Sequence, residues 1–110
     1  MQMIKTIVRP NKVDEVKDAL TKLNVSGMTV TEVRGHGHQK GHTAVYRGKE
    51  YTVDLVPKME IEVVVDDHVA EEVIAAVMKA ARTGEIGDGR VFVMPVSQSY
   101  KIRTGELLGA

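Results

Sequence analysis

Three glycines alternate with charged residues in the run G-E-I-G-D-G-R at residues 84–90. Glycines leave backbone N–H groups unshielded, and Arg90 adds a cation beside them, so the run has the composition of an anion-binding nest. It follows a predicted helix and precedes a predicted strand. The P-loop and Rossmann motifs have the reverse order, and neither consensus is present. Taken alone, such a run is more often a plain turn.

Three histidines lie in a second glycine-rich run, G-H-G-H-Q-K-G-H at residues 35–42. Imidazole is a common metal ligand, so His36, His38 and His42 are candidates for a metal site. Their spacing matches no established zinc pattern, and the chain contains no Cys. Solvated loop histidines are the favoured interpretation, and we expect His68 at the surface.

Two further pairs of charged residues share a face of a predicted strand, because residues two apart point the same way. Glu60 and Glu62 form one pair, and paired carboxylates can perform acid–base chemistry. No nucleophile or cleft is evident beside them, so exposed strand residues are the favoured interpretation. Lys101 and Arg103 form the other pair, with a solvated C-terminal edge as the alternative.

The stretch over residues 35–58 separates two strand-like regions and has neither a helical period nor strong alternation. An insert of this length in a compact domain usually indicates function or disorder. It carries Tyr46, Arg47 and Tyr51, and Tyr and Arg are enriched at the centres of protein interfaces. Docking on a partner is therefore the favoured interpretation, and a variable surface loop is the alternative.

Composition limits the class of protein. A chain of 110 residues is expected to form one domain. Lys plus Arg and Asp plus Glu both number 15, so no net charge attracts nucleic acid or an anionic membrane. We expect no direct contact with nucleic acid and no insertion into a membrane. The first residues lack signal-peptide organisation, so the cytoplasm is the expected location.

Strands are predicted over residues 3–9, 28–34, 59–65 and 91–96, with a short fifth over 100–103. A first helix is predicted to be capped by Asn11 and to fade near Asn24. A second is predicted to begin at Asp66 or Asp67 and to end at Gly84. Apolar residues recur at helical spacing in both: Val13, Val16, Leu20 and Leu23 in the first, and Ala70, Val73, Ile74, Val77 and Ala81 in the second.

The resulting order, β-α-β-β-α-β with a long loop between the second and third strands, predicts an α+β protein with the ferredoxin-like fold. In that fold both helices cover one face of an antiparallel sheet. Here the other face also carries apolar residues: Met3 and Ile7 alternate with Ile4 and Val8. We therefore expect self-association, which would cover the second face.

Nearly the whole chain resembles the nitrogen-regulatory PII signal-transduction family. Residues 46–51 (Y-R-G-K-E-Y) match the Y-R-G-x-E-Y pattern of the family's T-loop, and residues 83–93 (T-G-E-I-G-D-G-R-V-F-V) match its B-loop and the following strand. Further matches are G-M-T-V-T-E-V at 27–33, Q-K-G at 39–41 and K-I-R-T-G-E at 101–106. In this chain the T-loop corresponds to residues 36–56, the B-loop to residues 82–90 and the C-terminal segment to residues 99–110, within a single domain over 1–110.

The resemblance implies a homotrimer that binds ATP or ADP in clefts between subunits. The implied nucleotide contacts come from two neighbouring subunits. The glycines and cations noted above would thus all contact the phosphates of one nucleotide. One subunit would supply Gly35, Gly37, Val64, Gly87, Asp88, Gly89 and Arg90, and the next Gly27, Met28, Thr29, Glu62, Lys101 and Arg103. His38 and Gln39 are further implied nucleotide contacts. Many relatives have Arg where this chain has His38 and Lys101, and Lys lacks the bidentate fork of Arg.

The resemblance also implies binding of 2-oxoglutarate together with Mg²⁺ and ATP. Gln39 would ligate Mg²⁺, and the Lys58 ammonium would pair with a ligand carboxylate, with Lys40, Gly41 and Gly87 completing the site. The T-loop would dock on targets through Tyr46, Arg47, Gly48, Lys49, Glu50 and Tyr51. Tyr51 matches the residue that some relatives nucleotidylate, whereas Lys49 replaces a serine that others phosphorylate.

Three hypotheses remain. The first is a non-enzymatic sensor of nitrogen, carbon and energy status that blocks an ammonium transporter when the T-loop enters the channel. A variant of it regulates a cytosolic enzyme of nitrogen metabolism instead. The second is a small nucleotide-hydrolysing enzyme, motivated by Glu60, Glu62 and the glycine run. The third is a structural trimer without a ligand.

Overall fold

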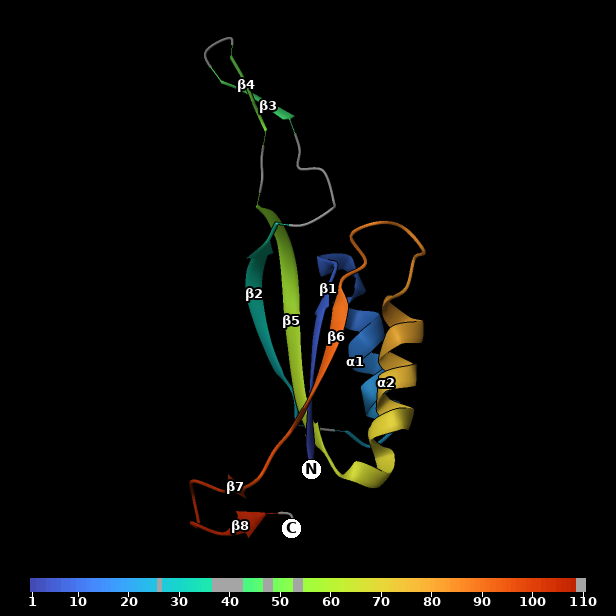
Figure 1. Cartoon of the computed structure of the whole chain (residues 1–110), viewed down its shortest axis with the longest axis vertical. Helices are drawn as coiled ribbons and strands as arrows, with labels where there is room; N and C mark the ends of the chain where they lie inside the picture. Colours follow the sequence, from blue (N-terminus) through green and yellow to red (C-terminus); the bar gives the residue numbers. More distant parts are fainter. Residues whose placement is uncertain (26, 37–42, 47–48, 53–54, 109–110) are drawn as a thin grey trace.

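The computed structural model describes residues 1–25, 27–36, 43–46, 49–52 and 55–108. Four long strands form one antiparallel sheet in the order β2-β5-β1-β6. They are β1 (Gln2–Val8), β2 (Thr29–Gly35), β5 (Val56–Val65) and β6 (Arg90–Pro95). Helices α1 (Val13–Lys22) and α2 (Asp67–Ala81) cover one face of this sheet, as Figure 1 shows. The predicted α+β, ferredoxin-like fold is confirmed.

The core lies between the sheet and the two helices. The buried side chains of α1 and α2 are those that the apolar spacing predicted, with Val13, Leu23 and Ile74 partly buried beside them. Strand alternation places Ile4 and Val8 of β1 toward the helices, each 1% exposed. The buried core of the chain consists of Ile4, Val8, Val16, Leu20, Ile61, Val63, Val65, Ala70, Val73, Val77 and Ala81.

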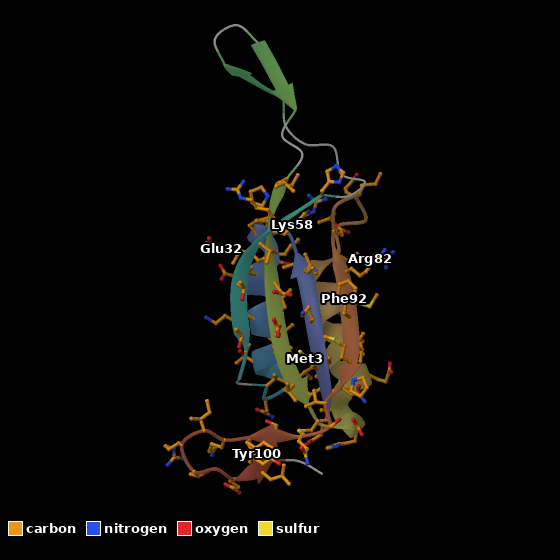
Figure 2. All side chains as sticks on the ribbon, turned by 60° about the vertical axis from the view of Figure 1, so that its left-hand side comes forward. Met3, Glu32, Lys58, Arg82, Phe92 and Tyr100 are labelled. Carbon is orange, nitrogen blue, oxygen red and sulfur yellow. The ribbon has the colours of Figure 1, made fainter. Side chains whose placement is uncertain are left out.

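The sheet face away from the helices is also apolar in part, as the sequence predicted. Met3 of β1 lies in register between Val64 of β5 and Met94 of β6. Val64 is 42% exposed and Phe92 is 40% exposed. Figure 2 shows this face, with Met3 and Phe92 labelled on neighbouring strands. We name the face that carries Met3, Val64, Phe92 and Met94 the open face.

The predicted helix ends need correction. Pro10 opens a 3₁₀ turn, η1 (Pro10–Lys12), and the α-helix begins only after it, with Lys12 rather than Asn11 at the N-cap. Neither α1 nor α2 has a side-chain capping hydrogen bond, although α2 does begin after Asp66. At its other end α2 stops at Ala81, three residues before Gly84. Asn24 follows α1 with a positive φ of 61°, which explains why the helix does not continue.

Two predictions about the loops were wrong in detail. Residues 35–58 were expected to lack regular structure, but β3 (Thr43–Tyr46) and β4 (Lys49–Thr52) pair as an antiparallel hairpin. Residues 100–103 were expected to form a strand. Instead β7 (Ser99–Tyr100) pairs with β8 (Leu107–Leu108), and Lys101 and Arg103 lie in the connection between them. These two cations therefore do not share a strand face.

Candidate functional site

The B-loop connects the C-terminal end of α2 to the first residue of β6. It lies at the same end of the main sheet as the start of β5, where the chain returns from the T-loop (Figure 1). Gly84, Gly87 and Gly89 have φ values of 89°, 100° and 105°, which L-residues with a side chain rarely adopt. At Gly89 space is also lacking, because a Cβ atom would lie 1.7 Å from the Ile7 carbonyl oxygen. The glycines thus permit a tight path directly over the end of β1.

Asp88 organises the first half of the B-loop. Its Oδ2 accepts hydrogen bonds from the backbone N–H groups of Thr83 and Gly84, both at 2.8 Å. Its Oδ1 accepts from the Thr83 hydroxyl and from Arg9 Nε, the latter at 3.2 Å. These contacts, with that of the Thr83 hydroxyl the largest, hold the pKa of the Asp88 carboxyl well below its usual range. Asp88 is therefore a carboxylate that is engaged within the loop.

Two cations below the B-loop hold two consecutive carbonyl groups. Arg9 Nη2 donates to the Ile86 carbonyl at 2.8 Å, and Lys58 Nζ donates to the Gly87 carbonyl. Lys58 is only 8% exposed. Burial lowers the pKa of Lys58, Arg9 lowers it further, and Asp88 partly opposes the change. Lys58 lies near the start of β5, so it joins the base of the T-loop to the B-loop (Figure 2).

The inward carbonyls determine where the next N–H groups point. The described chain has only trans peptide bonds, and in a trans peptide the C=O and the following N–H point in opposite directions. Because Arg9 and Lys58 hold the carbonyls of Ile86 and Gly87, the N–H groups of Gly87 and Asp88 point away from those cations. Neither N–H has an acceptor among the described residues. Two adjacent outward N–H groups can receive an anion.

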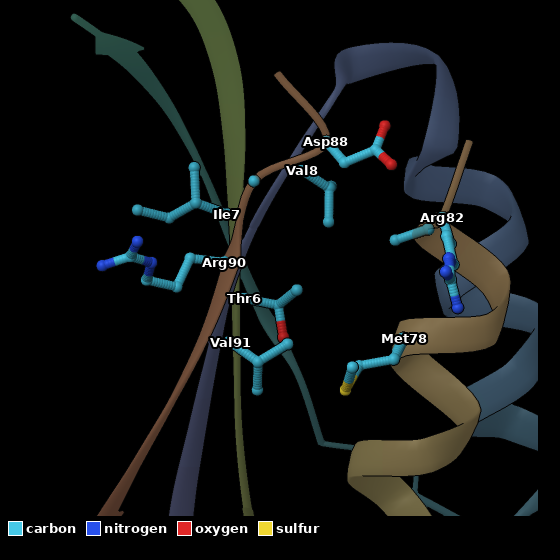
Figure 3. A pocket seen from close by; sticks show the side chains of 10 residues that line it. Thr6, Ile7, Val8, Met78, Arg82, Asp88, Arg90 and Val91 are labelled. Carbon is cyan, nitrogen blue, oxygen red and sulfur yellow. The ribbon is translucent and has the colours of Figure 1, made fainter. Parts of the chain in front are cut away.

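Arg90 begins β6 beside this pair of N–H groups and is exposed. In Figure 3 its side chain points away from α2, whereas Met78 points from α2 toward Thr6 and Val91. A pocket of about 390 Å³ lies on that helix side, lined by these three residues with Val8, Ala81, Arg82 and others. The predicted contacts Asp88, Gly89 and Arg90 also line this pocket.

The other predicted nucleotide contacts fall into two groups within one chain. Gly35 lies near the B-loop end of the sheet, and a Cβ atom there would contact Lys58 Cγ at 3.7 Å. Thr29 pairs in register with Glu62, toward the other end of β5, and Val64 follows on the same face. Lys101 and Arg103 belong to the C-terminal hairpin, which lies beyond the opposite end of the sheet (Figure 1). One chain alone does not bring Lys101 and Arg103 to the B-loop.

Several predicted residues lie outside the described part of the chain. They include the predicted Mg²⁺ ligand and the centre of the predicted docking segment. For Tyr46, Lys49, Glu50 and Tyr51 the structure describes the backbone as part of β3 or β4 and not the side chains. Wholly outside the description are Gly37, His38, Gln39, Lys40, Gly41, Arg47 and Gly48.

Of the groups considered for catalysis or metal binding, one carboxylate is engaged in an ion pair, whereas His38 and His42 lie outside the described residues. Glu60 forms an ion pair with Lys5 at 3.4 Å, across two neighbouring strands. His68 is exposed, as expected. Within the described ranges no three His, Cys, Asp or Glu side chains are placed to hold a metal ion. Neither helix of the described chain has the length and apolar character needed to cross a bilayer.

Arg9 was not expected from the sequence to be a functional residue. It was placed only at the end of the first predicted strand. Its contacts with Ile86 and Asp88 join positions 77 and 79 residues apart, so no local pattern indicates them. The available signal was a cation immediately before Pro10, a position that favours an extended backbone.

The chain matches the family model described as "Nitrogen regulatory protein P-II" over residues 1–106. The chain belongs to the P-II family. It is 54% identical to the nitrogen regulatory protein P-II of Azospirillum brasilense and 54% identical to that of Nostoc punctiforme. It is 50% identical to the protein of that name from Haemophilus influenzae. Each similarity covers 96% of this chain and 95% of the relative.

Membership of the P-II family confirms the resemblance on which the site residues were chosen. The three relatives are named regulatory proteins, which favours signalling over catalysis for this chain as well. The match includes both the B-loop and the C-terminal hairpin as far as residue 106.

Proposed function

We propose that this P-II family chain is a non-enzymatic sensor that binds ATP or ADP at the B-loop. The supporting observation is the pair of outward N–H groups at Gly87 and Asp88, held by the inward carbonyls of Ile86 and Gly87. A phosphate oxygen can accept from both N–H groups, and the exposed Arg90 adds a charge-assisted contact. The part of the nucleotide that binds is thus its polyphosphate, and the backbone N–H groups of Gly87 and Asp88 form the nest that receives it.

The proposed site is completed by a second copy of the chain in a homotrimer. Lys101 and Arg103 lie at the far end of the sheet from the B-loop of their own chain. A neighbouring copy can bring its own Lys101 and Arg103 to that loop. Packing of open faces against one another would also cover Val64 and Phe92, both of which are substantially exposed in the single chain.

The second proposed ligand is 2-oxoglutarate, bound with Mg²⁺ and ATP. Lys58 supports this proposal because it is a largely buried cation whose hydrogen-bond acceptor is a neutral carbonyl. An incoming carboxylate would provide a stronger, charged partner. Gln39 would help to hold the Mg²⁺ that accompanies ATP, because Mg²⁺ prefers oxygen ligands such as an amide side chain and phosphates.

The proposed output is regulation of an ammonium transporter through the T-loop. Ligands can change this loop only if they bind its conformations unequally. Lys58 is positioned for such coupling, since it follows the T-loop in sequence and contacts the B-loop in space. In the ADP-bound or 2-oxoglutarate-free state Arg47 would enter the channel, and Mg-ATP with 2-oxoglutarate would release it. A cytosolic enzyme of nitrogen metabolism is the alternative target.

Hydrolysis of nucleotides is the less favoured second function. Glu60, one of the two carboxylates that suggested it, forms an ion pair with Lys5 on the sheet. Because the Lys5 ammonium group already engages this carboxylate, the acid–base role that suggested hydrolysis is less favoured. Multiple turnovers at a saturable rate would reverse this preference.

Calorimetric titration tests the ligand proposal directly. ATP and ADP should each give a saturable isotherm, and 2-oxoglutarate should bind only with Mg²⁺ and ATP. Gly87→Ala should weaken both nucleotides, because its φ of 100° is one that alanine rarely adopts. Absence of heat with either nucleotide at millimolar concentration would contradict the proposal and favour the structural trimer.

Capture from membranes tests the target. Immobilised wild-type protein should retain an ammonium transporter without 2-oxoglutarate and release it when Mg-ATP and 2-oxoglutarate are added. Arg47→Ala should relieve inhibition of transport while ligand binding and assembly stay unchanged. No retention in either condition, or equal inhibition by the variant, would favour the cytosolic target.

A further inference from the structure

We propose that Arg9 is a positioning residue that keeps the B-loop shaped for phosphate while Lys58 exchanges its own partner. This inference rests on the proposed function, because it concerns the same nucleotide and 2-oxoglutarate sites. It assigns to Arg9 a role that neither the sequence motifs nor the predicted contact residues contain.

Arg9 holds the B-loop on both sides of Gly87. Its Nη2 donates to the Ile86 carbonyl at 2.8 Å, and its Nε donates to Asp88 Oδ1 at 3.2 Å. The planar guanidinium offers these donors in a fixed geometry, so one side chain sets the spacing between a carbonyl and a carboxylate. Through Asp88 the restraint extends to the N–H groups of Thr83 and Gly84. Arg9 therefore restrains most of the loop.

The backbone around Arg9 places its side chain within reach of the B-loop. Arg9 follows β1 directly and has an extended conformation, with φ of −62° and ψ of 142°. Pro10 favours that conformation, because its ring disfavours helical geometry in the preceding residue. The close passage of Gly89 over the Ile7 carbonyl brings the loop down to the end of β1. The Arg9 side chain, 22% exposed, lies between these two segments.

Lys58 is the cation that is free to change partner. Arg9 and Lys58 lie close enough to affect each other electrostatically, and Asp88 is the carboxylate near both. Asp88 is bonded to Arg9, whereas Lys58 has only the Gly87 carbonyl as its acceptor among the described residues. A carboxylate ligand would thus balance the charge of Lys58 without disturbing the Arg9–Asp88 pair.

The two cations therefore have separate tasks. If Lys58 turns toward a carboxylate, the Gly87 carbonyl loses its donor and the peptide between Gly87 and Asp88 loses one restraint. The two Arg9 contacts remain, and they hold the residues on either side. The nest can then keep a phosphate while the second ligand occupies Lys58. Without Arg9 the two ligands would compete, because among the described residues Lys58 would be the one remaining cation that holds a B-loop carbonyl.

The test uses Arg9→Gln, Arg9→Lys and a matched control, Arg82→Gln. Arg82 is also at the B-loop, but it is exposed and makes no side-chain hydrogen bond or ion pair within the described ranges. Each Gln variant therefore removes one positive charge from the same region. The full-length proteins are compared by hydrogen exchange of residues 84–90 without ligand, by ATP titration, and by ATP titration with saturating 2-oxoglutarate and Mg²⁺.

Arg9→Gln should speed exchange in the B-loop and weaken ATP about tenfold, as expected for loss of a charge-assisted contact. It should also reduce the factor by which 2-oxoglutarate strengthens ATP binding, since that factor measures coupling between the sites. Arg9→Lys should fall between wild type and Arg9→Gln. Arg82→Gln should stay within about twofold of wild type, as for an exposed surface change.

Wild-type exchange and wild-type ATP affinity in Arg9→Gln would overturn the inference, as would equal losses in Arg82→Gln, which would indicate bulk charge. If Arg9→Gln fails to fold, Arg9→Lys carries the same comparison with the charge retained. If wild type binds no nucleotide, the proposed function fails, while the exchange measurement still decides whether Arg9 positions the loop.

Discussion

The Lys58 ammonium group donates a hydrogen bond to the backbone carbonyl of Gly87, 29 residues away in sequence. This contact joins the strand that follows the T-loop to the loop that precedes β6. A change of hydrogen-bond partner at Lys58 would therefore act on both loops at once. The contact provides a direct physical route by which a ligand at one loop can alter the other.

Replacement of Lys58 by Met should weaken 2-oxoglutarate by about 1.5–3 kcal/mol, the cost of losing a hydrogen bond to a charged group. ATP should lose less, because both Arg9 contacts to the B-loop remain. Calorimetry with ATP, and then with 2-oxoglutarate in the presence of Mg-ATP, measures both effects. Lys79→Met, an exposed change on α2, is the control. Unchanged 2-oxoglutarate affinity in Lys58→Met would remove Lys58 from the site.

The glycines of the B-loop should differ in their tolerance of alanine. Gly89→Ala should destabilise the protein by about 3 kcal/mol or more, since the new Cβ would overlap the Ile7 carbonyl. Gly84→Ala has a similar φ of 89° but open space, so about 1–2 kcal/mol of backbone strain is expected. Urea unfolding of both variants measures the difference. Equal stability losses would mean that the loop does not pass so close to β1.

Asp88 should make the protein sensitive to acid. Its folded-state pKa lies below the unfolded value of about 3.9, so the unfolded chain binds more protons between the two values. The stabilisation is therefore complete above about pH 4 and is lost as the pH falls through the folded-state pKa. The Asp88→Asn variant should be less stable than wild type at neutral pH, and its free energy of unfolding should fall less on acidification.

Thermal unfolding between neutral pH and pH 2.5 would show this difference in slope. Asp18→Asn, which alters an exposed carboxylate on α1, is the matched control and should follow the wild-type curve. An Asp88→Asn curve parallel to wild type at every pH would show that Asp88 does not contribute through its charge.

The fold could be predicted because its signals are local and periodic. The apolar spacing of Val16 with Leu20, and of Val73 with Val77, identified the helix faces that are buried. The hairpin of β3 and β4 was missed because its sequence alternates only weakly, and it lies outside the main sheet whose alternation identified the other strands. The N-cap was misplaced because Pro10 and the 3₁₀ turn delay the start of α1.

The candidate site was predictable only where a motif carries it. The glycine run suggested an anion nest, with a plain turn as the more common alternative, and the structure shows that Arg9 and Lys58 hold two consecutive carbonyls of this run. The role of Arg9 depends on tertiary structure, because Arg9 contacts B-loop residues that are distant in sequence and become its neighbours only in the folded protein. Lys101 and Arg103 were assigned to a strand from their alternation, yet they lie in a hairpin connection, where sequence spacing does not fix direction.

The last prediction concerns assembly through the open face. Val64 lies in register with Met3, which is itself beside Met94, so one row of apolar side chains crosses three strands. Val64→Glu would place a charge in the middle of this row. If the row is buried between copies, desolvation of that carboxylate opposes association.

Light scattering should therefore show trimers for wild type and smaller species for Val64→Glu. Nucleotide binding should be lost in parallel, because Lys101 and Arg103 would no longer reach a neighbouring B-loop. Val30→Glu is a closely matched control. Val30 is also 42% exposed, but it pairs with the buried Ile61 and so belongs to the opposite side of the sheet. A trimeric Val64→Glu protein, or a monomeric wild type, would show that copies do not associate through the open face.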